Sequence, residues 1–422
     1  MKLNRQNFNA PLAPERMVHI GIGAFAKAHQ LWYTQQVDVN NEWGVVAFTG
    51  RSATIADQLT EQDGLYTLVE RGAQGDKFEV MSRIVRSVDG NNINELEATI
   101  ANPNIAVVTL TITEAGYGTT NNPTVVITRI ANALNARHKS NGKPIALVPC
   151  DNIPNNGEFL RSVINNVSAN FDEKAKSWLQ QNVSFVSTSI DRITPKTTNS
   201  DIELVKTATG WEDNSVTVTE PFKDWILCGE FPAGRPQWEN AGANFVTDIE
   251  IFERRKLWLL NGSHSLLAYA GIARGHQTVA EAIVDSECRA RVEELWDAAA
   301  RHLPQAELQI DSYRKALIER FENPRIAHQL RQIAIDGATK LAVRIAPGAK
   351  AELAAGRDAG AAAFTIAVWA EFLAKGEFID SREQDIRTAL ENQDSKRALI
   401  RLLDPDLAKD DQFVGLVKSF NI

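Results

Sequence analysis

Short apolar strands alternate with helical stretches through the first 235 residues, and few folds accommodate such an alternation. Runs of apolar and β-branched residues typical of buried strands lie at Met17–Ile20, Val45–Phe48, Ala106–Thr111, Ile145–Val148 and Ser184–Val186. Continuous apolar strands separated by helices are typical of a parallel, doubly wound sheet covered on both faces. The sequence therefore predicts an α/β domain over residues 1–235, with an inserted hairpin formed by Tyr66–Glu70 and Phe78–Ile84.

The character of the chain changes after the segment FPAGRPQWE (231–239), whose prolines and glycine are typical of a hinge. Strand patterns almost vanish, and the remaining chain predicts long helices at Glu239–Arg274, Ala280–His302, Ala306–Phe321, Ala351–Ala374 and Ser381–Leu403. We therefore expect two domains, a dinucleotide-binding Rossmann-type domain at 1–235 and a mainly α-helical domain at 236–422 that binds substrate and carries catalysis.

Composition excludes several classes of protein. Lys and Arg total 45 against 53 Asp and Glu, a net charge of −8, and this acidic balance argues against a nucleic-acid-binding protein. No run of about twenty apolar residues predicts a membrane span, and the N-terminus lacks an apolar signal-peptide core. Three scattered cysteines fit reduced thiols. We expect a cytoplasmic protein that binds a small molecule, with neither nucleic acid, membrane nor obligate protein partner.

A glycine-rich turn follows the first predicted strand. In GIGAFAKAH (21–29), Gly21 permits a tight turn and Gly23 lets the backbone approach a pyrophosphate at a helix N-terminus. The alternative is a purely structural turn. The second strand ends with Arg51 and Ser52 instead of an acidic residue that would bind a ribose 2′-hydroxyl. These two residues could meet a 2′-phosphate, or Arg51 could be a solvated loop residue or stack on adenine, so NADP is not excluded beside NAD.

The segment EIFERRKLWLLNGSHSLLAYAG (250–271) places polar side chains on one side of an apolar helix. At 100° per residue, Glu253, Lys256, Asn261 and His264 share an arc of about 140°. Burial lowers the pKa of a lysine, which can then act as a general base toward an alcohol. Asn261 and His264 could hydrogen-bond the same oxygen. The alternative is a solvated polar face with a satisfied core histidine.

Three further clusters are candidates for a site. Asp151 and Asn152 in CDNIPNNG (150–157) follow the fourth strand, where doubly wound folds bind ligands, and Asp191 stands beside Arg192 in IDRIT (190–194). Each is also consistent with a polar turn or an internal salt bridge. In the helical domain, the donors that would suit an anionic or polyhydroxy substrate are Arg320, His328, Lys340 and Arg344. The histidines show no paired spacing, so no metal site is expected.

A series of motifs, spread in order over nearly the whole chain, resembles the long-chain, metal-independent polyol dehydrogenases, the family of mannitol 2-dehydrogenase and fructuronate reductase. These motifs are GIGAFAKAH (21–29), QDGLYTLVER (62–71), TLTITEAGY (109–117), CDNIPNNG (150–157), IDRITP (190–195), EPFKDW (220–225), GRPQWENAGANFV (234–246), KLWLLNGSHSLLAY (256–269) and RFENP (320–324). The family fold, a Rossmann domain followed by a mainly helical domain, agrees with the expectation from the strand and helix patterns.

The resemblance implies a role for each candidate residue. It makes Lys256 the general base, Asn261 and Asn152 the oxyanion-hole donors, and His264 a substrate-positioning residue. It matches Asp191 to the aspartate of the family signature and Glu253 to a glutamate linked to proton exit. The residues implied to contact the cofactor are Gly21, Gly23, Ala24, Phe25, Arg51, Ser52, Thr113 and Glu114.

The implied activity is hydride transfer between a nicotinamide cofactor and a secondary alcohol. QIAIDGATKLAVR (332–344) is more similar to fructuronate and other uronate reductases than to mannitol dehydrogenases. D-Mannonate/D-fructuronate is therefore the expected substrate pair, with Arg320, Lys340 and Arg344 meeting the carboxylate. The alternatives are D-mannitol/D-fructose or another polyol, a non-catalytic nucleotide-binding protein, and a metal-dependent alcohol dehydrogenase.

Overall fold

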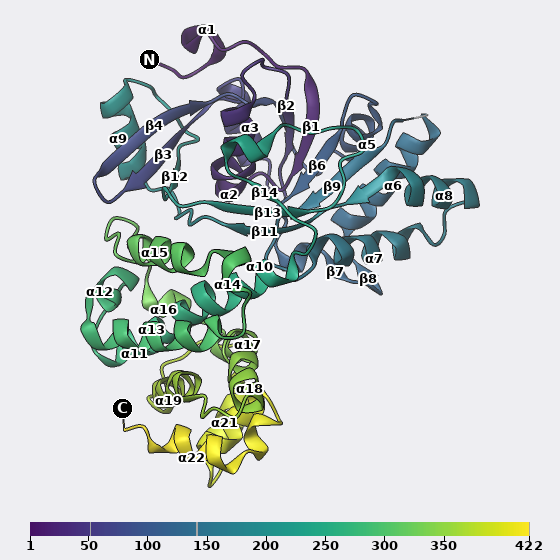
Figure 1. Cartoon of the computed structure of the whole chain (residues 1–422). Helices are drawn as coiled ribbons and strands as arrows, with labels where there is room; N and C mark the ends of the chain where they lie inside the picture. The colour runs from purple at the N-terminus through teal and green to yellow at the C-terminus, as the bar shows by residue number, and fades with distance from the viewer. Residues whose placement is uncertain (51, 141, 422) are drawn as a thin grey trace. The chain divides into compact units, whose positions relative to one another are not determined.

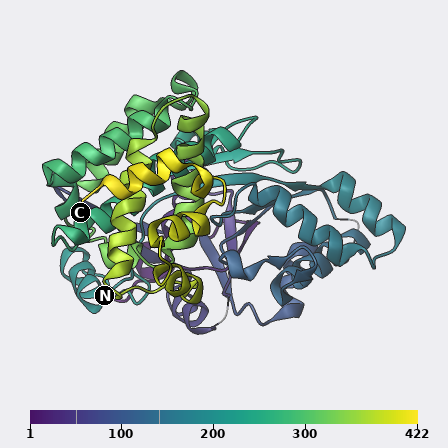
Figure 2. The same cartoon turned by 90° about the horizontal axis from the view of Figure 1, so that it is seen from below.

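The chain separates into two compact units, Met1–Glu250 and Ile251–Ile422. The computed structural model describes every residue except 51, 141 and 422. The elements of both units are labelled in Figure 1, and Figure 2 shows them from below, with the helices of the second unit in green and yellow. No helix within the described residues is long and apolar enough to cross a membrane.

The first unit is built on a six-stranded parallel sheet in the order β10-β9-β6-β1-β2-β5. Its strands are β1 (Glu15–Ile20), β2 (Gly44–Phe48), β5 (Ile84–Val88), β6 (Val107–Leu110), β9 (Ile145–Pro149) and β10 (Val183–Phe185). The five buried strands expected from apolar runs of the sequence are all present in this sheet. The predicted α/β class, a doubly wound Rossmann-type sheet followed by a mainly helical part, is thus confirmed.

Both faces of this sheet are buried because successive side chains of a strand point to opposite faces. Met17 and Val45 pack into one apolar cluster, whereas their neighbours Val18 and Val46 pack into another. The first cluster includes residues of α2 (Ala24–Ala28), α3 (Gln30–Val37) and α4 (Thr54–Glu61). The second includes residues of α5 (Ile93–Ala101), α6 (Val125–Lys139), α7 (Asn156–Ser168) and α8 (Glu173–Asn182).

Two smaller sheets complete the first unit. One consists of β12 (Thr217–Thr219), β3 (Tyr66–Gly72) and β4 (Gly75–Met81), and the other of β11 (Ser187–Asp191), β13 (Asp224–Cys228) and β14 (Asn244–Phe245). The remaining elements are α1 (Arg5–Phe8), α9 (Asn199–Thr209) and the pair β7 (Gly118–Thr119) and β8 (Asn122–Pro123).

The predicted hairpin is present, but its second strand ends at Met81 and not at Ile84. Ile84 begins β5 and pairs with Val45 of the main sheet. The buried side chain of Arg83 forms a salt bridge with Asp38, which follows α3, so the chain leaves the hairpin here. The sequence pattern had merged two consecutive apolar runs that belong to different sheets.

The helix expected over residues 239–274 begins later. Trp238–Ala241 forms a single 3₁₀ turn, and Asn244–Phe245 is a strand that pairs with β13. Trp238 is fully buried against Trp225 of β13, with ring centroids 4.6 Å apart. This aromatic contact fixes Trp238, in the segment expected to form a hinge, against β13.

Within its described residues, the second unit consists of helices joined by loops. The chain enters it through α10 (Glu250–Arg255), a π-helix (Lys256–Asn261) and α11 (Gly262–Ala273). The helices that follow are α12 (Val279–Val284), α13 (Ser286–Ala300), α14 (Gln305–Leu308), α15 (Ile310–Phe321), α16 (Leu330–Ile333), α17 (Gly337–Arg344), α18 (Ala346–Ala354), α19 (Gly360–Ala374), α20 (Glu383–Leu390), α21 (Ser395–Leu403) and α22 (Asp411–Ser419). Helix α11 is buried over most of its length and packs against α12, α13, α16, α17 and α19.

Several long helices expected from the sequence are each two shorter helices. Asp285 caps α13 by accepting hydrogen bonds from two backbone N–H groups, and Asp394 caps α21 in the same way through one. Gly356, with φ of +74°, follows the end of α18. The apolar periodicity continues across these breaks because both halves bury a face, so periodicity alone did not locate them.

Candidate active site

The glycine turn and the loop after β6 lie at the switch point of the main sheet. From β1 the sheet continues in one direction through β2 and β5, and from β6 it continues in the opposite direction through β9 and β10. β1 and β6 are neighbours, as Figure 1 shows, so the segments that leave their carboxyl ends diverge between them. Doubly wound sheets bind ligands at this position.

The two glycines of the turn serve different needs. Gly21 has φ of +92°, and a Cβ atom there would lie 2.2 Å from the carbonyl oxygen of Thr111, so the protein itself requires glycine. Gly23 is extended, and a Cβ atom there would meet only the oxygen of Gly21, at 3.8 Å. The space beside Gly23 therefore fits the close approach of a pyrophosphate to the backbone.

The other residues expected to contact a cofactor lie around this turn or on neighbouring loops. Ala24 and Phe25 open α2, and the Phe25 ring stacks on His29 with centroids 4.9 Å apart. Ser52 is exposed and hydrogen-bonds Thr54 at 2.8 Å. Thr113 and Glu114 are exposed on the loop after β6, and Arg51 lies outside the described residues.

Asp151 ties the end of β9 to the loop after β6. Its Oδ2 accepts hydrogen bonds from the Ile112 N–H at 3.0 Å and the Tyr117 hydroxyl at 2.7 Å, and its Oδ1 accepts from the Thr113 N–H at 2.9 Å. Burial raises the pKa of Asp151, while these hydrogen bonds act in the opposite direction. The sequence analysis placed this residue in a ligand-binding turn without a separate role, because its partners lie almost forty residues away.

Asn152 and Asp191 also belong to the first unit. Asn152 is exposed beside Asp151, and Asp191 is the buried last residue of β11. The neighbouring Arg192 is buried, donates to Glu70 at 2.9 Å, and also binds the backbone oxygen of Glu220 at 3.1 Å. Arg192 is thus a structural cation that joins β11 to β3 and to the segment before β13.

The remaining proposed catalytic residues lie where the helix of the second unit changes its winding. Lys256 and Asn261 are the first and last residues of the π-helix, both half-buried, and Glu253 lies in the preceding turn. The angles derived for an α-helix are wrong here, because a π-helix pairs residues i and i+5. Residues five apart, such as Lys256 and Asn261, are therefore more nearly aligned than the α-helical spacing had indicated.

Side chains from elsewhere in the unit stabilise this π-helix. The Trp296 indole N–H donates to the Leu259 carbonyl oxygen at 2.9 Å, and an Arg344 N–H donates to the Asn261 carbonyl oxygen at 3.4 Å. Buried carbonyl groups need donors, and the altered winding changes which backbone groups can supply them. π-Helical turns occur frequently at functional sites.

His264 lies at the centre of a cluster formed by the residues proposed to bind substrate. Its ring centroid is 5.0 Å from that of His328, nearly perpendicular, and its Nε2 has no hydrogen-bond partner among the described residues. Burial, His328 and the charges of Arg320, Arg344 and Lys340 hold the pKa of His264 well below its ordinary value. Burial followed by the charges of Arg320 and Lys340 lowers the pKa of His328 to about 4. Both imidazoles are therefore neutral at pH 7 beside three cations.

Hydrogen bonds tie Lys340 and Arg344 to other parts of the second unit. The Lys340 ammonium donates to the Ile333 carbonyl oxygen at 3.0 Å. The Nη1 group of Arg344 donates to the Asn261 carbonyl oxygen and, at 3.2 Å, to the Ser265 hydroxyl. The sequence analysis did not identify Ser265, since only the fold places α17 beside the start of α11.

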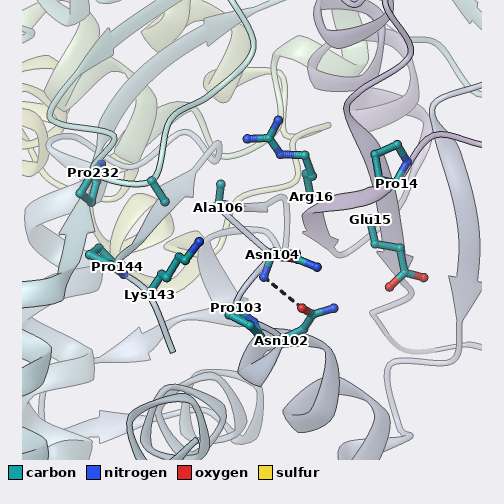
Figure 3. Close-up of a pocket in the computed structure, with 11 residues that line it drawn as sticks. Pro14, Glu15, Arg16, Asn102, Pro103, Asn104, Ala106, Lys143, Pro144 and Pro232 are labelled. Atoms are coloured by element: carbon teal, nitrogen blue, oxygen red, sulfur yellow. Dashed lines mark hydrogen bonds between the residues drawn. The ribbon is translucent and has the colours of Figure 1, made fainter. Parts of the chain in front are cut away.

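One cavity of the first unit is lined by none of the predicted site residues. A cavity of about 680 Å³ lies where β1, β6 and β9 begin, at the edge opposite the glycine turn. Figure 3 shows Arg16 and Lys143 beside it, with Asn102 accepting a hydrogen bond from the Asn104 N–H. Within the described part of the chain, no group of three or more His, Cys, Asp and Glu side chains is arranged to hold a metal ion.

Two family profiles together match most of the chain. The Mannitol dehydrogenase Rossmann domain matches residues 15–240, and the Mannitol dehydrogenase C-terminal domain matches residues 248–419. D-Mannonate oxidoreductase of Escherichia coli (strain K12) is 30% identical over 449 residues, which cover 96% of this chain and 92% of that protein. Mannitol 2-dehydrogenase of Aspergillus terreus (strain NIH 2624 / FGSC A1156) is 32% identical over 366 residues, covering 79% and 73% respectively.

A solved structure has the same fold over almost the whole chain. Mannitol 2-dehydrogenase of Pseudomonas fluorescens, in a ternary complex with NAD and D-mannitol, superposes with a TM-score of 0.82. It is 28% identical in sequence, and the match covers 99% of this chain and 96% of that one.

Proposed function

Because this chain belongs to the mannitol dehydrogenase family, we propose that it is an NAD(P)-dependent oxidoreductase of a sugar acid or polyol. The substrate that we infer is the pair D-mannonate and D-fructuronate. The observation that supports this choice is the cluster of Arg320, Lys340 and Arg344 around two neutral histidines, described above. A carboxylate would accept charge-assisted hydrogen bonds from these cations, which are stronger than those a neutral hydroxyl accepts.

The cofactor proposed is NAD, with NADP as the open alternative. Gly21 and Gly23 would hold the pyrophosphate at the start of α2, where the space beside Gly23 supports the fit. Ala24, Phe25, Thr113 and Glu114 would complete the contacts, and Ser52 would lie near the adenosine ribose. A nicotinamide cofactor held there would supply hydride transfer to or from the substrate carbon.

The proposed chemistry at the substrate is proton transfer by Lys256. In the oxidising direction its neutral amine takes the proton of the reacting hydroxyl, and in the reducing direction its ammonium returns a proton to the carbonyl oxygen. Asn261 donates a hydrogen bond to that oxygen as charge develops on it, and the family resemblance gives Asn152 the same role. Glu253 would pass the proton from Lys256 to water, and His264 and Asp191 would hold neighbouring hydroxyls.

A second candidate is the oxidation of D-mannitol to D-fructose, and one observation favours it. Lys340 and Arg344 each donate to backbone or hydroxyl oxygens of the protein, so part of their hydrogen-bonding capacity is already used. In that case Lys340 fixes α17 against α16, Arg344 fixes α17 against the π-helix and α11, and the substrate needs no negative charge.

Steady-state assays with D-fructuronate and D-fructose, each with NADH and with NADPH, test the proposal by the change in absorbance at 340 nm. A kcat/KM at least about tenfold higher on D-fructuronate, equivalent to about 1.4 kcal/mol, supports the sugar-acid assignment. Preference for D-fructose supports the polyol assignment. No turnover on either ketose or on other polyols, with NADH still bound, supports a non-catalytic nucleotide-binding protein.

A further inference from the structure

The backbone of Thr113 has an unusual conformation on the loop after β6. Its φ is +64° and its ψ is 161°, a combination adopted almost only by glycine. A β-branched residue with positive φ is a genuine outlier, since its side chain crowds the backbone. Such a conformation persists only where the surrounding structure enforces it, and conformations of this kind cluster at functional sites.

Asp151 supplies the contacts that enforce it. Its two carboxylate oxygens accept hydrogen bonds from the N–H groups of Ile112 and Thr113, at 3.0 and 2.9 Å. These bonds fix the two peptide units that precede Thr113. Tyr117, at the far end of the loop, donates its hydroxyl to the same carboxylate at 2.7 Å. One side chain at the end of β9 therefore holds both ends of this short loop.

Asp151 is itself fixed in place. The Asn156 amide at the start of α7 donates to the Asp151 carbonyl oxygen at 3.0 Å and to that of Thr188 at 2.9 Å, which ties the turn to β11. Asn156 is fully buried. The carboxylate is therefore presented to the loop from a rigid part of the sheet.

The loop held in this way adjoins the glycine turn. The Thr111 hydroxyl donates to the Gly21 carbonyl oxygen at 3.0 Å, and His19 of β1 hydrogen-bonds the same hydroxyl at 3.0 Å. The conformation of the loop after β6 is thus coupled by direct contacts to the turn that is proposed to hold the pyrophosphate.

We propose that Asp151 is a positioning residue for cofactor binding, whose carboxylate holds Thr113 in its strained conformation and so sets the loop 112–117 against the glycine turn. This inference rests on the proposed nicotinamide-dependent function. It goes beyond that function because it gives Asp151 a role in cofactor binding that acts through the strained backbone of Thr113. If Asp151 merely stabilised the fold, the effect of substituting it would not depend on which residue stands at position 113.

Substitution of glycine for Thr113 separates the two roles. Glycine adopts the observed conformation without crowding, so the carboxylate is less needed when residue 113 is glycine. We expect D151N to raise the NADH dissociation constant at least about tenfold in the wild-type background. In the T113G background the same change should raise it less than about threefold relative to T113G alone. Titration of NADH fluorescence measures all four proteins.

The buried carboxylate of Asp213 provides a matched control in the same unit. It accepts hydrogen bonds from the Thr67 and Ser215 N–H groups and from the Gln62 amide, but it contacts β3 instead of the loop. D213N should therefore change NADH binding by the same factor whether residue 113 is threonine or glycine. An equal effect of D151N in both backgrounds, or no effect of D151N on NADH binding, would overturn the inference.

A second measurement does not depend on the stability of D151N. Relief of strain predicts that T113G raises the melting temperature, whereas A115G, two residues further along the same exposed loop and without a positive φ, lowers it. A lower melting temperature for both variants overturns the inference. If the wild-type protein fails to bind NADH, the proposed function is overturned as well. If it binds NADH but D151N has the same effect with glycine at position 113, the inference alone is overturned.

Discussion

Arg344 on α17 donates a hydrogen bond at 3.4 Å to the carbonyl oxygen of Asn261, the residue that ends the π-helix. The same nitrogen, Nη1, also donates to the Ser265 hydroxyl one turn later, at 3.2 Å. A guanidinium that bridges two positions of neighbouring helical turns restricts the helix just where its winding changes. The contact links the proposed substrate-binding cations to the segment that carries the proposed base.

Removal of this contact should reduce turnover on every substrate. In R344A the carbonyl group of Asn261 loses its side-chain donor, so the π-helix relaxes and the Asn261 amide is displaced. We expect kcat to fall about tenfold or more with both D-fructuronate and D-fructose, and a rise in KM only with the acid. R331A is the control, because Arg331 is 69% exposed and pairs with exposed Glu377. A loss confined to KM for D-fructuronate would show that Arg344 binds substrate without supporting the helix.

Replacement of the two glycines of the turn should have different consequences. G21A places a Cβ atom 2.2 Å from a backbone oxygen in an unfavourable conformation, so it should lower the melting temperature by about 4 °C or more and also weaken NADH binding. G23A meets no such obstacle, so its melting temperature should stay within about 1 °C of wild type. Its Cβ atom would instead occupy the space expected for the pyrophosphate and raise the NADH dissociation constant roughly tenfold.

Calorimetry and NADH titration on the same preparations check this pair. G415A is the control, since no atom lies within 4 Å of a Cβ built there and its φ is not positive. Unchanged NADH binding by G23A would remove the glycine turn from the proposed cofactor site.

Every strand of the main sheet except β5 was predictable because it carries a local signal. A continuous apolar run such as Val45–Phe48 is buried on both faces, and this pattern depends little on the partner strands. The break between β4 and β5 was missed because it depends on Arg83, whose partner Asp38 lies in a different element. Helix breaks in the second unit were missed for a similar reason, as capping by Asp285 interrupts the backbone without interrupting the apolar face.

The candidate site was predictable in its residue types but not in its geometry. The motif that contains Lys256, Asn261 and His264 predicted a site on one helix. The π-helical winding of that helix depends on hydrogen-bond donors from Trp296 and Arg344, more than thirty residues away. The conformation of Thr113 likewise depends on Asp151, which is adjacent only once β6 and β9 have paired. Contacts that the fold creates between distant segments have no signature in either segment alone.

A network around Glu352 makes the second unit sensitive to acid. This buried carboxylate accepts hydrogen bonds from His302 at 2.6 Å, from Arg357 at 2.9 Å and from Arg301. Burial alone would raise the pKa of Glu352, but the hydrogen bonds from Arg301, Arg357 and His302 outweigh it and lower the pKa to about 2. A carboxyl whose pKa is lower in the folded than in the unfolded protein stabilises the fold above the unfolded value of 4.5. That stabilisation is lost as the pH falls toward 2.

Urea unfolding followed by circular dichroism at pH 7, 5 and 3 checks this expectation. E352Q should unfold more easily than wild type at pH 7 by about 3 kcal/mol, and the difference should shrink to less than half by pH 3. E383Q is the control, because the exposed pair of Glu383 with Arg387 contributes little at any pH. A difference between wild type and E352Q that stays constant down to pH 3 would contradict the proposed charge network.

Substitution of the proposed general base separates chemistry from binding. K256A should lower kcat by about 10²–10⁴-fold, because proton transfer to or from the reacting oxygen then depends on water. NADH binding should persist, since the glycine turn belongs to the other unit of the chain. The pH dependence of kcat should also lose the limb that reports the lysine in the wild-type protein. K315A is the control, as the Lys315 side chain is 80% exposed and pairs with the exposed Glu319. Turnover within about threefold of wild type in K256A would assign the base to another residue, whereas loss of NADH binding together with turnover would indicate a structural role for Lys256.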